Sequence, residues 1–291
     1  MSTIVISGAT GFLGSHLAHF FIARGETVYG VKRRHSSLDK LEGISDTIHF
    51  INVDGDDWLE QMCQVAPDTI IHTACSYGRN SESLSDLLQT NIIFSAKLLE
   101  AAIESQATCF INADSALNPS VSSYALSKYQ FKQWGERFQD KIQFINLRIE
   151  HMYGAGDDDH KFVKWLINQI IDGVSSVSLT SGVQQRDFIY IDDVVSAFDT
   201  VIQHKNQFPN YIEIDIASGE LIAVKDFINQ ILSVYNVMYG PSDTVLDFGK
   251  IAYRENELMT PDVDGSYIKK LGWKAKINYK EGIKKLLKDL R

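Results

Sequence analysis

The chain reads Thr3-Ile-Val-Ile-Ser7-Gly8-Ala-Thr-Gly11-Phe-Leu-Gly14 near its start, an apolar run followed by evenly spaced glycines. The apolar run predicts a buried parallel strand. The residues after Gly14 follow a helical apolar pattern that ends before Gly25. A strand, a glycine-rich turn and a helix in this order are typical of the start of a dinucleotide-binding domain. This stretch therefore decides the predicted fold class.

Each glycine of the turn has a physical role in binding a dinucleotide. Gly8 permits a tight turn, Gly11 lets the backbone approach a pyrophosphate, and Gly14 lets the helix pack closely on the strand. The helix then directs its unpaired N–H groups and its positive dipole end at the phosphates. We expect the turn and the first helical residues to contact the cofactor, namely Gly8, Thr10, Gly11, Phe12, Leu13 and Gly14.

The residues after the second predicted strand indicate which dinucleotide binds. An NAD site usually has an acidic residue here, which binds the adenosine ribose. This chain has Lys32-Arg33-Arg34 instead. A carboxylate would repel a 2′-phosphate, whereas arginine can bind it with two hydrogen bonds. We therefore predict NADP(H), with Arg33 and Arg34 as the phosphate clamp. The alternative is a solvated basic turn.

The end of the third predicted strand supplies a further candidate contact. Ligands of open α/β sheets bind at the carboxyl ends of the strands. Asp54 and Gly55 follow the apolar run 48–53, and both are expected near the cofactor. Asp54 can face the adenine amino group, or it can cap the helix that begins near Trp58.

The fourth predicted strand ends in small and polar residues. Thr73 and Ala74 are expected at the cofactor, because alanine is small enough to let it lie close. Tyr77 lies three residues further on and can reach a substrate. His72 lies inside the strand, where we expect a hydrogen-bonded core histidine rather than a catalyst.

Strands alternate with helical patterns through the first half of the chain. This alternation predicts an α/β fold, a Rossmann-type doubly wound parallel sheet with right-handed crossovers. We expect residues 1–148 and about 186–217 to form the NADP-binding domain. A smaller, discontinuous C-terminal domain of about 149–185 and 218–291 is expected to bind the substrate.

Composition narrows the class of protein. The chain has 291 residues, 44% of them hydrophobic and 22% charged, which is usual for a soluble globular protein. The formal net charge of -9 makes nucleic acid an unexpected partner. No apolar run is long enough for a membrane span, and no signal segment is visible. Cys63, Cys75 and Cys109 lack metal or disulfide spacing, so we expect a cytoplasmic protein.

Tyr124 and Lys128 are the candidate catalytic pair. Residues four apart lie on one face of a helix, and no other tyrosine of the chain has lysine at this spacing. A phenol loses its proton near pH ~10, and a neighbouring ammonium favours the phenolate. Ser115, at the end of the fifth predicted strand, can offer a hydroxyl to the same oxygen. The alternative is a surface pair on an amphipathic helix.

Several motifs occur in one order along the chain: Gly8-x-x-Gly11-x-x-Gly14, Asp54, Asn91, Tyr124-x-x-x-Lys128, Leu147-Arg148, Met152-Tyr153-Gly154, Arg186-Asp187-Phe188, Asp192-Asp193 and Leu271-Gly272-Trp273. Together they resemble the extended short-chain dehydrogenases/reductases, the NAD-dependent epimerase/dehydratase family, which act mostly on nucleotide sugars. The resemblance implies that Tyr124 donates or accepts the proton. It implies that Lys128 binds the nicotinamide ribose and tunes Tyr124, and that Ser115 orients the substrate oxygen. Tyr124, Lys128 and Asn91 are thus expected at the cofactor.

Within this family, three pieces look most similar to the CDP-paratose and CDP-abequose synthases: Asn112–Ala116, Tyr124–Lys128 and Arg148–Gly154. The resemblance implies NADPH-dependent reduction of the 4-keto group of a CDP-4-keto-3,6-dideoxyglucose, for bacterial O-antigen. It implies that Arg186 and Arg254 hold the diphosphate of a nucleotide-diphosphate sugar. Family members are often homodimers through two helices, here 83–106 and 122–140.

The chain also departs from the family pattern. Dehydratases of the family have two acidic residues after the hydroxyl residue, whereas Ser115 is followed by Ala116 and Leu117, which disfavours dehydration. His151 stands where most relatives have an asparagine that contacts the substrate, although histidine can also donate a hydrogen bond. The run 157–160, three aspartates and a histidine, is interpreted as solvated surface, and no metal is expected.

Two other functions remain open. A nucleotide-sugar epimerase would use the same tyrosine and lysine but would keep its cofactor bound and show no net redox change. A non-catalytic NADP-binding regulator would have no need of a tuned phenol.

Overall fold

The chain folds into two compact units. The computed structural model describes residues 2–78 and 82–290. One unit comprises Met1–Arg148 and Phe198–Ile214, and the other comprises Ile149–Ala197 and Asp215–Arg291. The sequence predicted a return to the first unit near residue 186, and in the structure the return comes at Phe198.

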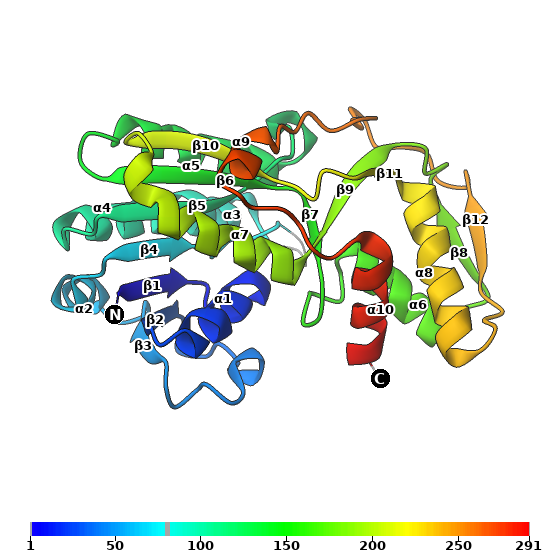
Figure 1. Ribbon diagram of the computed structural model, residues 1–291, viewed down its shortest axis with the longest axis horizontal. Coiled ribbons are helices and arrows are strands. Elements are labelled where there is room, and N and C mark those ends of the chain that lie inside the picture. Colours follow the sequence, from blue (N-terminus) through cyan, green and yellow to red (C-terminus); the bar gives the residue numbers. More distant parts are fainter. Residues whose placement is uncertain (1, 79–81, 291) are drawn as a thin grey trace. The chain divides into compact units, whose positions relative to one another are not determined.

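The first unit is built on a seven-stranded sheet with the strand order β10-β6-β5-β4-β1-β2-β3 (Figure 1). Ile4 of β1 pairs in parallel with Val28 of β2 on one side and with Thr69 of β4 on the other. The predicted doubly wound parallel sheet is confirmed. The strands are β1 Thr3–Ser7, β2 Thr27–Lys32, β3 His49–Asn52, β4 Thr69–His72, β5 Cys109–Ser115, β6 Gln143–Ile149 and β10 Tyr211–Ile216.

Helices cover this sheet and bury its apolar strands. They are α1 Phe12–Ala23, α2 Trp58–Val65, α3 Leu84–Leu88, α4 Ser95–Glu104 and α5 Ser123–Arg137. One core cluster joins residues of the strands to residues of α2, α4 and α5, including Val5, Ile70, Leu98, Phe110 and Phe131. Burying one such side chain stabilises the fold by about 1.5–3 kcal/mol. The apolar runs from which the strands were predicted therefore form the interior.

The helix predicted at 83–106 is interrupted in the structure. A π-helical turn, Gln89–Phe94, separates α3 from α4. A π turn adds a residue to the helical repeat, and such turns are frequent at functional sites. Asn91 lies inside this turn and is buried. An apolar periodicity cannot reveal one extra residue in a helix, so the sequence predicted a single element.

The second unit contains two small sheets. β9 Gln185–Tyr190 lies between β11 Leu221–Ala223, which is antiparallel to it, and β7 His151–Tyr153, which is parallel. β12 Val245–Phe248 pairs with β8 Ser176–Leu179. Because β9 pairs with β7 and β11, it belongs to the second unit, and this pairing moves the boundary from 186 to 198. Its helices are α6 Phe162–Ile171, α8 Val224–Tyr239, α9 Ser266–Lys270 and α10 Tyr279–Asp289. Helix α7, Ile191–His204, begins in this unit and continues into the first unit at Phe198.

Two buried aspartates tie distant segments of the second unit together. Asp187 accepts the backbone N–H groups of Ser218 and Gly219 at 2.8 and 2.7 Å. Asp193 accepts those of Lys276 and Ile277, both at 2.9 Å. Asp187 and Asp193 therefore have a structural role. Their carboxylates bind segment 218–219 to β9 and segment 276–277 to α7.

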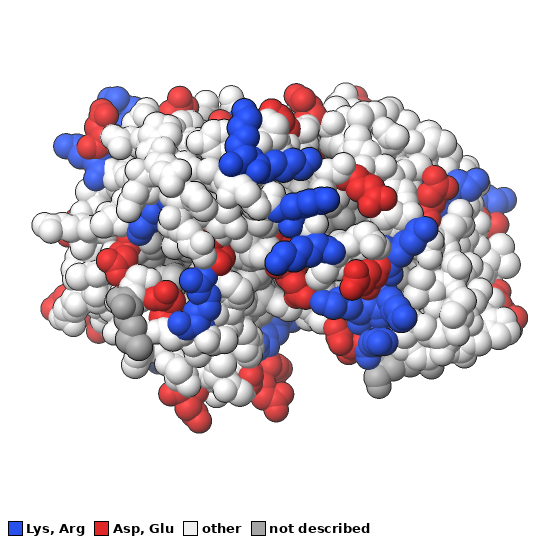
Figure 2. Space-filling view, viewed as in Figure 1, with Lys and Arg blue, Asp and Glu red and all other residues white. Residues whose placement is uncertain are grey.

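Figure 2 shows lysine and arginine side chains gathered along the C-terminal segment from α9 to α10. Other residues separate most of these basic side chains in the sequence, so no long basic run was visible there. Lys285 Nζ lies 2.9 Å from Asp192 Oδ2, which neutralises part of this charge. In the described ranges, no helix is long and apolar enough to cross a membrane. The same ranges hold no group of three acidic, histidine or cysteine side chains that could bind a metal.

Candidate functional site

The glycine turn between β1 and α1 leaves no room for side chains. Gly8 has a φ of +72°, in the left-handed region, and a Cβ there would come within 2.8 Å of Ala74 Cα. A Cβ on Gly14 would lie 2.1 Å from the Gly8 carbonyl oxygen. Gly11 donates its N–H to that oxygen at 2.8 Å and precedes α1, so no side chain caps this helix. The turn therefore fits the phosphates of a dinucleotide, which bind at an uncapped helix N-terminus.

The other predicted residues of this turn differ in exposure. Thr10 and Phe12 are half-buried, whereas Leu13 is buried in the core. Leu13 can therefore offer a ligand only its backbone. The structure brings the whole predicted turn to the carboxyl ends of β1 and β4, which are neighbouring strands. This is the point at which the strand order reverses, where ligands of such sheets bind.

The basic turn after β2 lies beside the end of β3. Arg33 and Arg34 are exposed, and the backbone N–H of Arg34 donates to the carboxylate of Asp54. The Lys32 ammonium lies 3.3 Å from the Arg33 carbonyl oxygen and packs over the Phe50 ring. The structure thus brings the predicted phosphate clamp and Asp54 together. Asp54 holds the basic turn rather than capping α2, whose preceding residue is Asp57.

The end of β4 is fastened to β1. Thr73 donates both its hydroxyl and its N–H to the Ser7 carbonyl oxygen, at 2.7 and 3.1 Å. His72 is fully buried, with Nδ1 2.6 Å from Ser7 Oγ and Nε2 2.7 Å from Ser95 Oγ. Both ring nitrogens are therefore satisfied, and the predicted core role of His72 is confirmed. Burial lowers the pKa of His72, and the charge of Lys128 lowers it further.

Asn91 ties the loop after β4 to α5. Its Oδ1 accepts the N–H of Ser76 at 2.7 Å, and its Nδ2 donates to the Ser76 carbonyl oxygen at 2.8 Å. Nδ2 also donates to Ser127 Oγ at 2.9 Å. These bonds use both amide hydrogens. Asn91 therefore positions this loop and α5, and its predicted side-chain contact with a cofactor remains a prediction.

Tyr124 and Lys128 lie one turn apart on α5, as their spacing predicted. Ser122 caps this helix, with its hydroxyl accepting the N–H of Ala125 at 3.1 Å. Tyr124 is half-buried, and its ring packs against that of Tyr77. Ser115 is the last residue of β5 and is also half-buried. The three predicted catalytic residues thus lie on two elements of the first unit, Ser115 on β5 and both Tyr124 and Lys128 on α5.

Lys128 carries a buried ammonium group. The residue is only 3% exposed, and Nζ lies 3.5 Å from Asn112 Oδ1. Among the residues that the structure describes, 2–78 and 82–290, Lys128 forms no ion pair with a carboxylate. A buried charge costs free energy unless acceptors surround it. Lys128 can therefore donate further hydrogen bonds, which fits the hydroxyls of a ribose.

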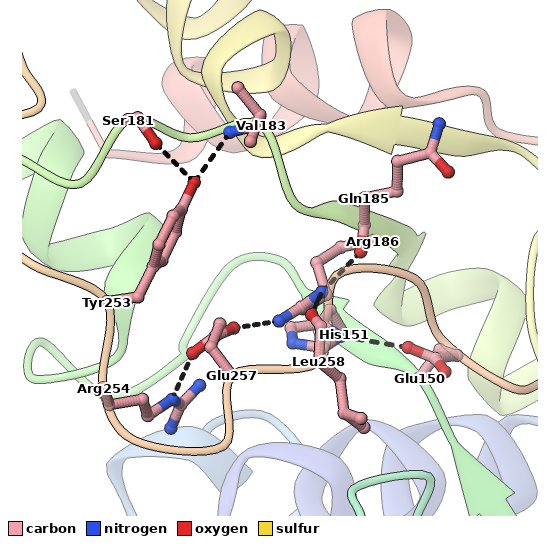
Figure 3. Close-up of polar contacts among 10 residues, drawn as sticks. All are labelled: Glu150, His151, Ser181, Val183, Gln185, Arg186, Tyr253, Arg254, Glu257 and Leu258. Atoms are coloured by element: carbon pink, nitrogen blue, oxygen red, sulfur yellow. Dashed lines mark hydrogen bonds and ion pairs between the residues drawn. The ribbon is translucent and has the colours of Figure 1, made fainter.

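In the second unit, one carboxylate bridges the two predicted diphosphate ligands (Figure 3). Glu257 Oε1 pairs with Arg186, and Glu257 Oε2 lies 2.5 Å from Arg254 Nε. Arg186 also donates to the carbonyl oxygens of Gln185 and Leu258, at 2.6 and 2.8 Å. Its side chain is 8% exposed, whereas that of Arg254 is 56% exposed. Burial lowers the pKa of Arg186, and the Glu257 carboxylate opposes that shift.

The same region holds the predicted contact His151. Its Nδ1 lies 3.0 Å from Oε2 of Glu150, a buried carboxylate (Figure 3). Its ring packs edge-on against Phe188. The segment that carries Arg254 is anchored by Tyr253, whose hydroxyl accepts the N–H of Val183 at 3.1 Å. The structure thus brings together the predicted substrate residues of this unit, His151, Arg186 and Arg254.

Sequence reasoning missed the partners that organise these residues. Glu257 gave a weak signal, because it lies three residues after Arg254 in an otherwise irregular segment. Asn112 and Asn146 gave a clearer signal, because each is a polar residue inside an apolar strand. A buried polar side chain requires hydrogen-bond partners, and those partners come from elements that are distant in the sequence.

The comparison with protein families agrees with this geometry. The family described as the NAD dependent epimerase/dehydratase family matches residues 4–217. The chain belongs to this family. The resemblance inferred from the motifs is therefore confirmed.

Two curated proteins of similar sequence and one solved structure of similar fold show which proteins this chain resembles. The chain is 32% identical to the CDP-abequose synthase of Salmonella typhimurium, over 99% of this chain and 98% of that protein. It is 29% identical to the CDP-abequose synthase of Salmonella muenchen, over 98% and 96% of the two chains. UDP-glucuronic acid 4-epimerase from Bacillus cereus, solved with UDP-glucuronic acid and NAD, shares the fold. Its TM-score is 0.83 at 21% identity, over 99% of this chain and 98% of that one.

Proposed function

We propose that the protein reduces the C4 keto group of a CDP-linked 4-keto-3,6-dideoxyhexose with NADPH, in the biosynthesis of bacterial O-antigen deoxysugars. The observation that carries the proposal is the buried Lys128 ammonium one helical turn from the half-buried Tyr124 phenol. The full-length similarity to two CDP-abequose synthases supports the sugar and the nucleotide. The absence of acidic residues directly after Ser115 favours reduction over dehydration.

In this proposal Tyr124 is the acid. NADPH, when bound, supplies the hydride that the keto carbon accepts. Tyr124 donates its phenolic proton to the keto oxygen, which becomes the C4 hydroxyl, and the phenolate is reprotonated from solvent. The Lys128 ammonium stabilises that phenolate and binds the nicotinamide ribose. Ser115 donates a hydrogen bond to the same substrate oxygen and so orients the carbonyl.

The preference for NADP(H) over NAD(H) rests on the turn after β2. Both arginines of this turn are exposed, and Asp54 already accepts the N–H of Arg34. We expect Arg33→Ala and Arg34→Ala each to weaken NADPH binding about 10-fold or more and to leave NADH binding unchanged. Fluorescence titration of both cofactors checks this, with Lys40→Ala on an exposed turn as the control. Tighter binding of NADH than of NADPH by the wild-type protein would contradict this preference.

The diphosphate of the substrate is assigned to Arg186 and Arg254. Two guanidinium groups suit two phosphates, because each can form paired hydrogen bonds with phosphate oxygens. Binding energy from this remote part of the substrate then positions the sugar for reduction. His151 is assigned to the sugar or the pyrophosphate, and Tyr77 to the substrate next to Tyr124.

The reaction is tested by the absorbance of NADPH with a panel of nucleotide-linked 4-keto sugars. Stoichiometric loss of NADPH with the CDP-linked 3,6-dideoxy substrate is the expected result. The C4 configuration of the product then distinguishes a paratose from an abequose product. No loss of NADPH with any keto sugar would overturn the reductase proposal.

An epimerase is the second candidate, favoured by the similarity to the solved 4-epimerase. It would interconvert nucleotide sugars without net consumption of NADPH and would be purified with its cofactor bound. A non-catalytic regulator would bind NADP(H) equally well as wild type and as Tyr124→Phe. Its regulatory effect would be the same in both proteins. Loss of NADPH absorbance identifies the reductase. Interconversion of nucleotide sugars without that loss identifies the epimerase, and cofactor binding with neither reaction identifies the regulator.

We also propose a homodimer through α3, the π turn and α5. These elements, together with Phe138 directly after α5, expose large apolar side chains: Leu84, Leu88, Ile93, Leu126, Tyr129, Trp134 and Phe138. Exposed apolar patches of this kind often mark protein interfaces. Sedimentation equilibrium should find a dimer of the wild-type protein and a monomer of Leu126→Glu. Val237→Glu, on exposed α8, is the matched control and should remain dimeric.

A further inference from the structure

Buried side chains of the first unit form a chain of hydrogen bonds that begins at Lys128. Lys128 Nζ lies 3.5 Å from Asn112 Oδ1, and Asn112 Nδ2 donates to Asn146 Oδ1 at 2.7 Å. Asn146 Nδ2 in turn donates to Asp114 Oδ2 at 2.8 Å. Asn112 and Asn146 are 0% exposed, on neighbouring strands β5 and β6. These polar groups are therefore shielded from water along their whole length.

The far end of this chain carries a second carboxylate. Asn146 Nδ2 lies 3.4 Å from Glu213 Oε2, and Lys132 Nζ donates to that oxygen at 2.7 Å. Tyr211 donates its hydroxyl to Glu213 Oε1 at 3.1 Å. Burial raises the pKa of Glu213, but its bonds with Lys132 and Tyr211 outweigh burial and hold the pKa below its ordinary value. Glu213 is therefore an ionised acceptor.

The charges at the two ends set the direction of every amide. The ionised Glu213 can only accept hydrogen bonds, so Asn146 presents its NH2 group to Glu213 and, with the same group, to Asp114. Its carbonyl oxygen then faces Asn112, which must present its own NH2 group. The oxygen of Asn112 is left facing Lys128, whose ammonium can only donate. Reversing one amide would place two donors or two acceptors together in a buried site, which is unfavourable.

We propose that Asn112 is a positioning residue for Lys128 and that Asn146 sets the orientation of Asn112. This inference rests on the role that the proposed function gives to Lys128. A buried ammonium needs an acceptor, and two aligned amides polarise each other toward that charge. Tyr124 lies one turn from Lys128 on the same helix, and His72 on β4 is close enough for the Lys128 charge to lower its pKa. His72 is neutral, so it adds no charge beside the ammonium.

The test uses leucine, which has nearly the shape of asparagine without its polar atoms. In Asn112→Leu we expect kcat of NADPH oxidation to fall about 10- to 100-fold, the range for losing a hydrogen bond to a charge. The pH at which the rate is half-maximal should also move. Asn146→Leu should cause a smaller loss in the same direction, because Asn112 can then rotate. In the double variant Asn146→Leu should add no further loss, because it acts through Asn112.

Gln143→Leu is the matched control on the same strand, β6. Its amide donates to the carbonyl oxygens of Lys205 and Phe208, at 2.8 and 3.2 Å. We expect it to lower the free energy of unfolding while the pH profile stays that of the wild type. Asn112→Ser is a second variant in case Asn112→Leu does not fold. Its hydroxyl can donate toward Asn146 but is too short to reach Lys128.

Cofactor binding separates this inference from the proposed function. NADPH and NADH are titrated by fluorescence without substrate, for the wild type, both single variants and the double variant. If no keto sugar is reduced, the proposed function fails. Weaker binding in Asn112→Leu, with no further change in the double variant, would still uphold the inference. Unchanged kcat, pH profile and binding in Asn112→Leu, additive losses, or a wild type that binds neither cofactor would each overturn it.

Discussion

The rings of Tyr77 and Tyr124 lie against each other, with their centroids 4.7 Å apart and their planes tilted by 37°. Tyr77 belongs to the loop after β4, and Asn91 holds this loop through both backbone groups of Ser76. Tyr124 lies in the first turn of α5, to which Asn91 is also bonded through Ser127. One buried amide therefore fixes both partners of the aromatic contact. Tyr124, the side chain predicted to donate or accept the proton, is thus oriented by its packing against Tyr77 as well as by its helix.

Replacing Tyr124 by phenylalanine should abolish turnover while the ring contact persists. Loss of a positioned proton donor typically costs a factor of about 10²–10⁴ in rate. We expect kcat of NADPH oxidation to fall at least about 100-fold in Tyr124→Phe. The free energy of unfolding and the Kd of NADPH should stay close to wild type. A variant that retained more than a tenth of the rate would contradict the role of Tyr124 as the acid.

Tyr77 should act through its ring. An aromatic pair contributes about 0.5–1.5 kcal/mol beyond the burial of its area. Tyr77→Leu should therefore lower kcat several-fold, because Tyr124 loses the surface that orients it. Tyr77→Phe keeps the ring and should keep kcat, so a loss in Tyr77→Phe would show that the Tyr77 hydroxyl itself contacts the substrate. Steady-state kinetics of both variants distinguish these outcomes.

A methyl group at Gly14 should damage the turn that begins the fold. The added Cβ would lie 2.1 Å from the Gly8 carbonyl oxygen, so the backbone must move. Overpacking of this kind costs about 1–3 kcal/mol, and Gly14→Ala should lose that much free energy of unfolding in urea titration. Cofactor binding should weaken with it. Gly265→Ala is the control, because a Cβ there meets nothing closer than 4.0 Å, and it should unfold like the wild type.

The two arginines bridged by Glu257 should respond differently to alanine. The Arg186 side chain is buried and pairs with Glu257, so Arg186→Ala leaves this carboxylate with the exposed Arg254 alone and should cost about 1.5–3 kcal/mol of stability. Arg254 is half exposed, and Arg254→Ala should change stability by less than about 1 kcal/mol. Both should weaken CDP binding about 10-fold or more, measured by calorimetry. Normal CDP binding by Arg254→Ala would exclude it as a phosphate ligand.

His72 should make stability depend on pH. Its pKa is lowered in the folded protein, so below pH ~6.5 the unfolded chain binds more protons than the native one. The free energy of unfolding should therefore fall as the pH falls from 7 to 5, by up to about 1.4 kcal/mol per pH unit. His72→Gln lacks this pH-dependent contribution. The difference in free energy of unfolding between His72→Gln and the wild type should therefore shrink as the pH falls toward 5.

Urea unfolding at several pH values measures this effect. His49→Gln is the control, because it removes an exposed histidine and leaves Ser7 and Ser95 paired. If His49→Gln and His72→Gln change the pH dependence equally, the buried imidazole is not its source.

Local patterns predicted the elements of the first unit well. The run 3–7 and the glycines after it predicted β1, the turn and α1, because both depend on residues close in sequence. The π turn around Asn91 was missed, since an apolar pattern does not register a single inserted residue. β9 was assigned to the wrong unit, because strand pairing is a non-local choice that its own residues do not encode.

The sequence by itself determined which chemical groups the protein has and which of them are neighbours on one element. Tyr124 and Lys128 share a helix face because helical geometry places residues four apart together. Only the tertiary structure decided that Asn112 meets Asn146, 34 residues away, and that Glu257 bridges Arg186 and Arg254. Those contacts depend on how strands pair and loops close. Burial then decides their strength, because a buried charge or amide must find its partner inside the protein.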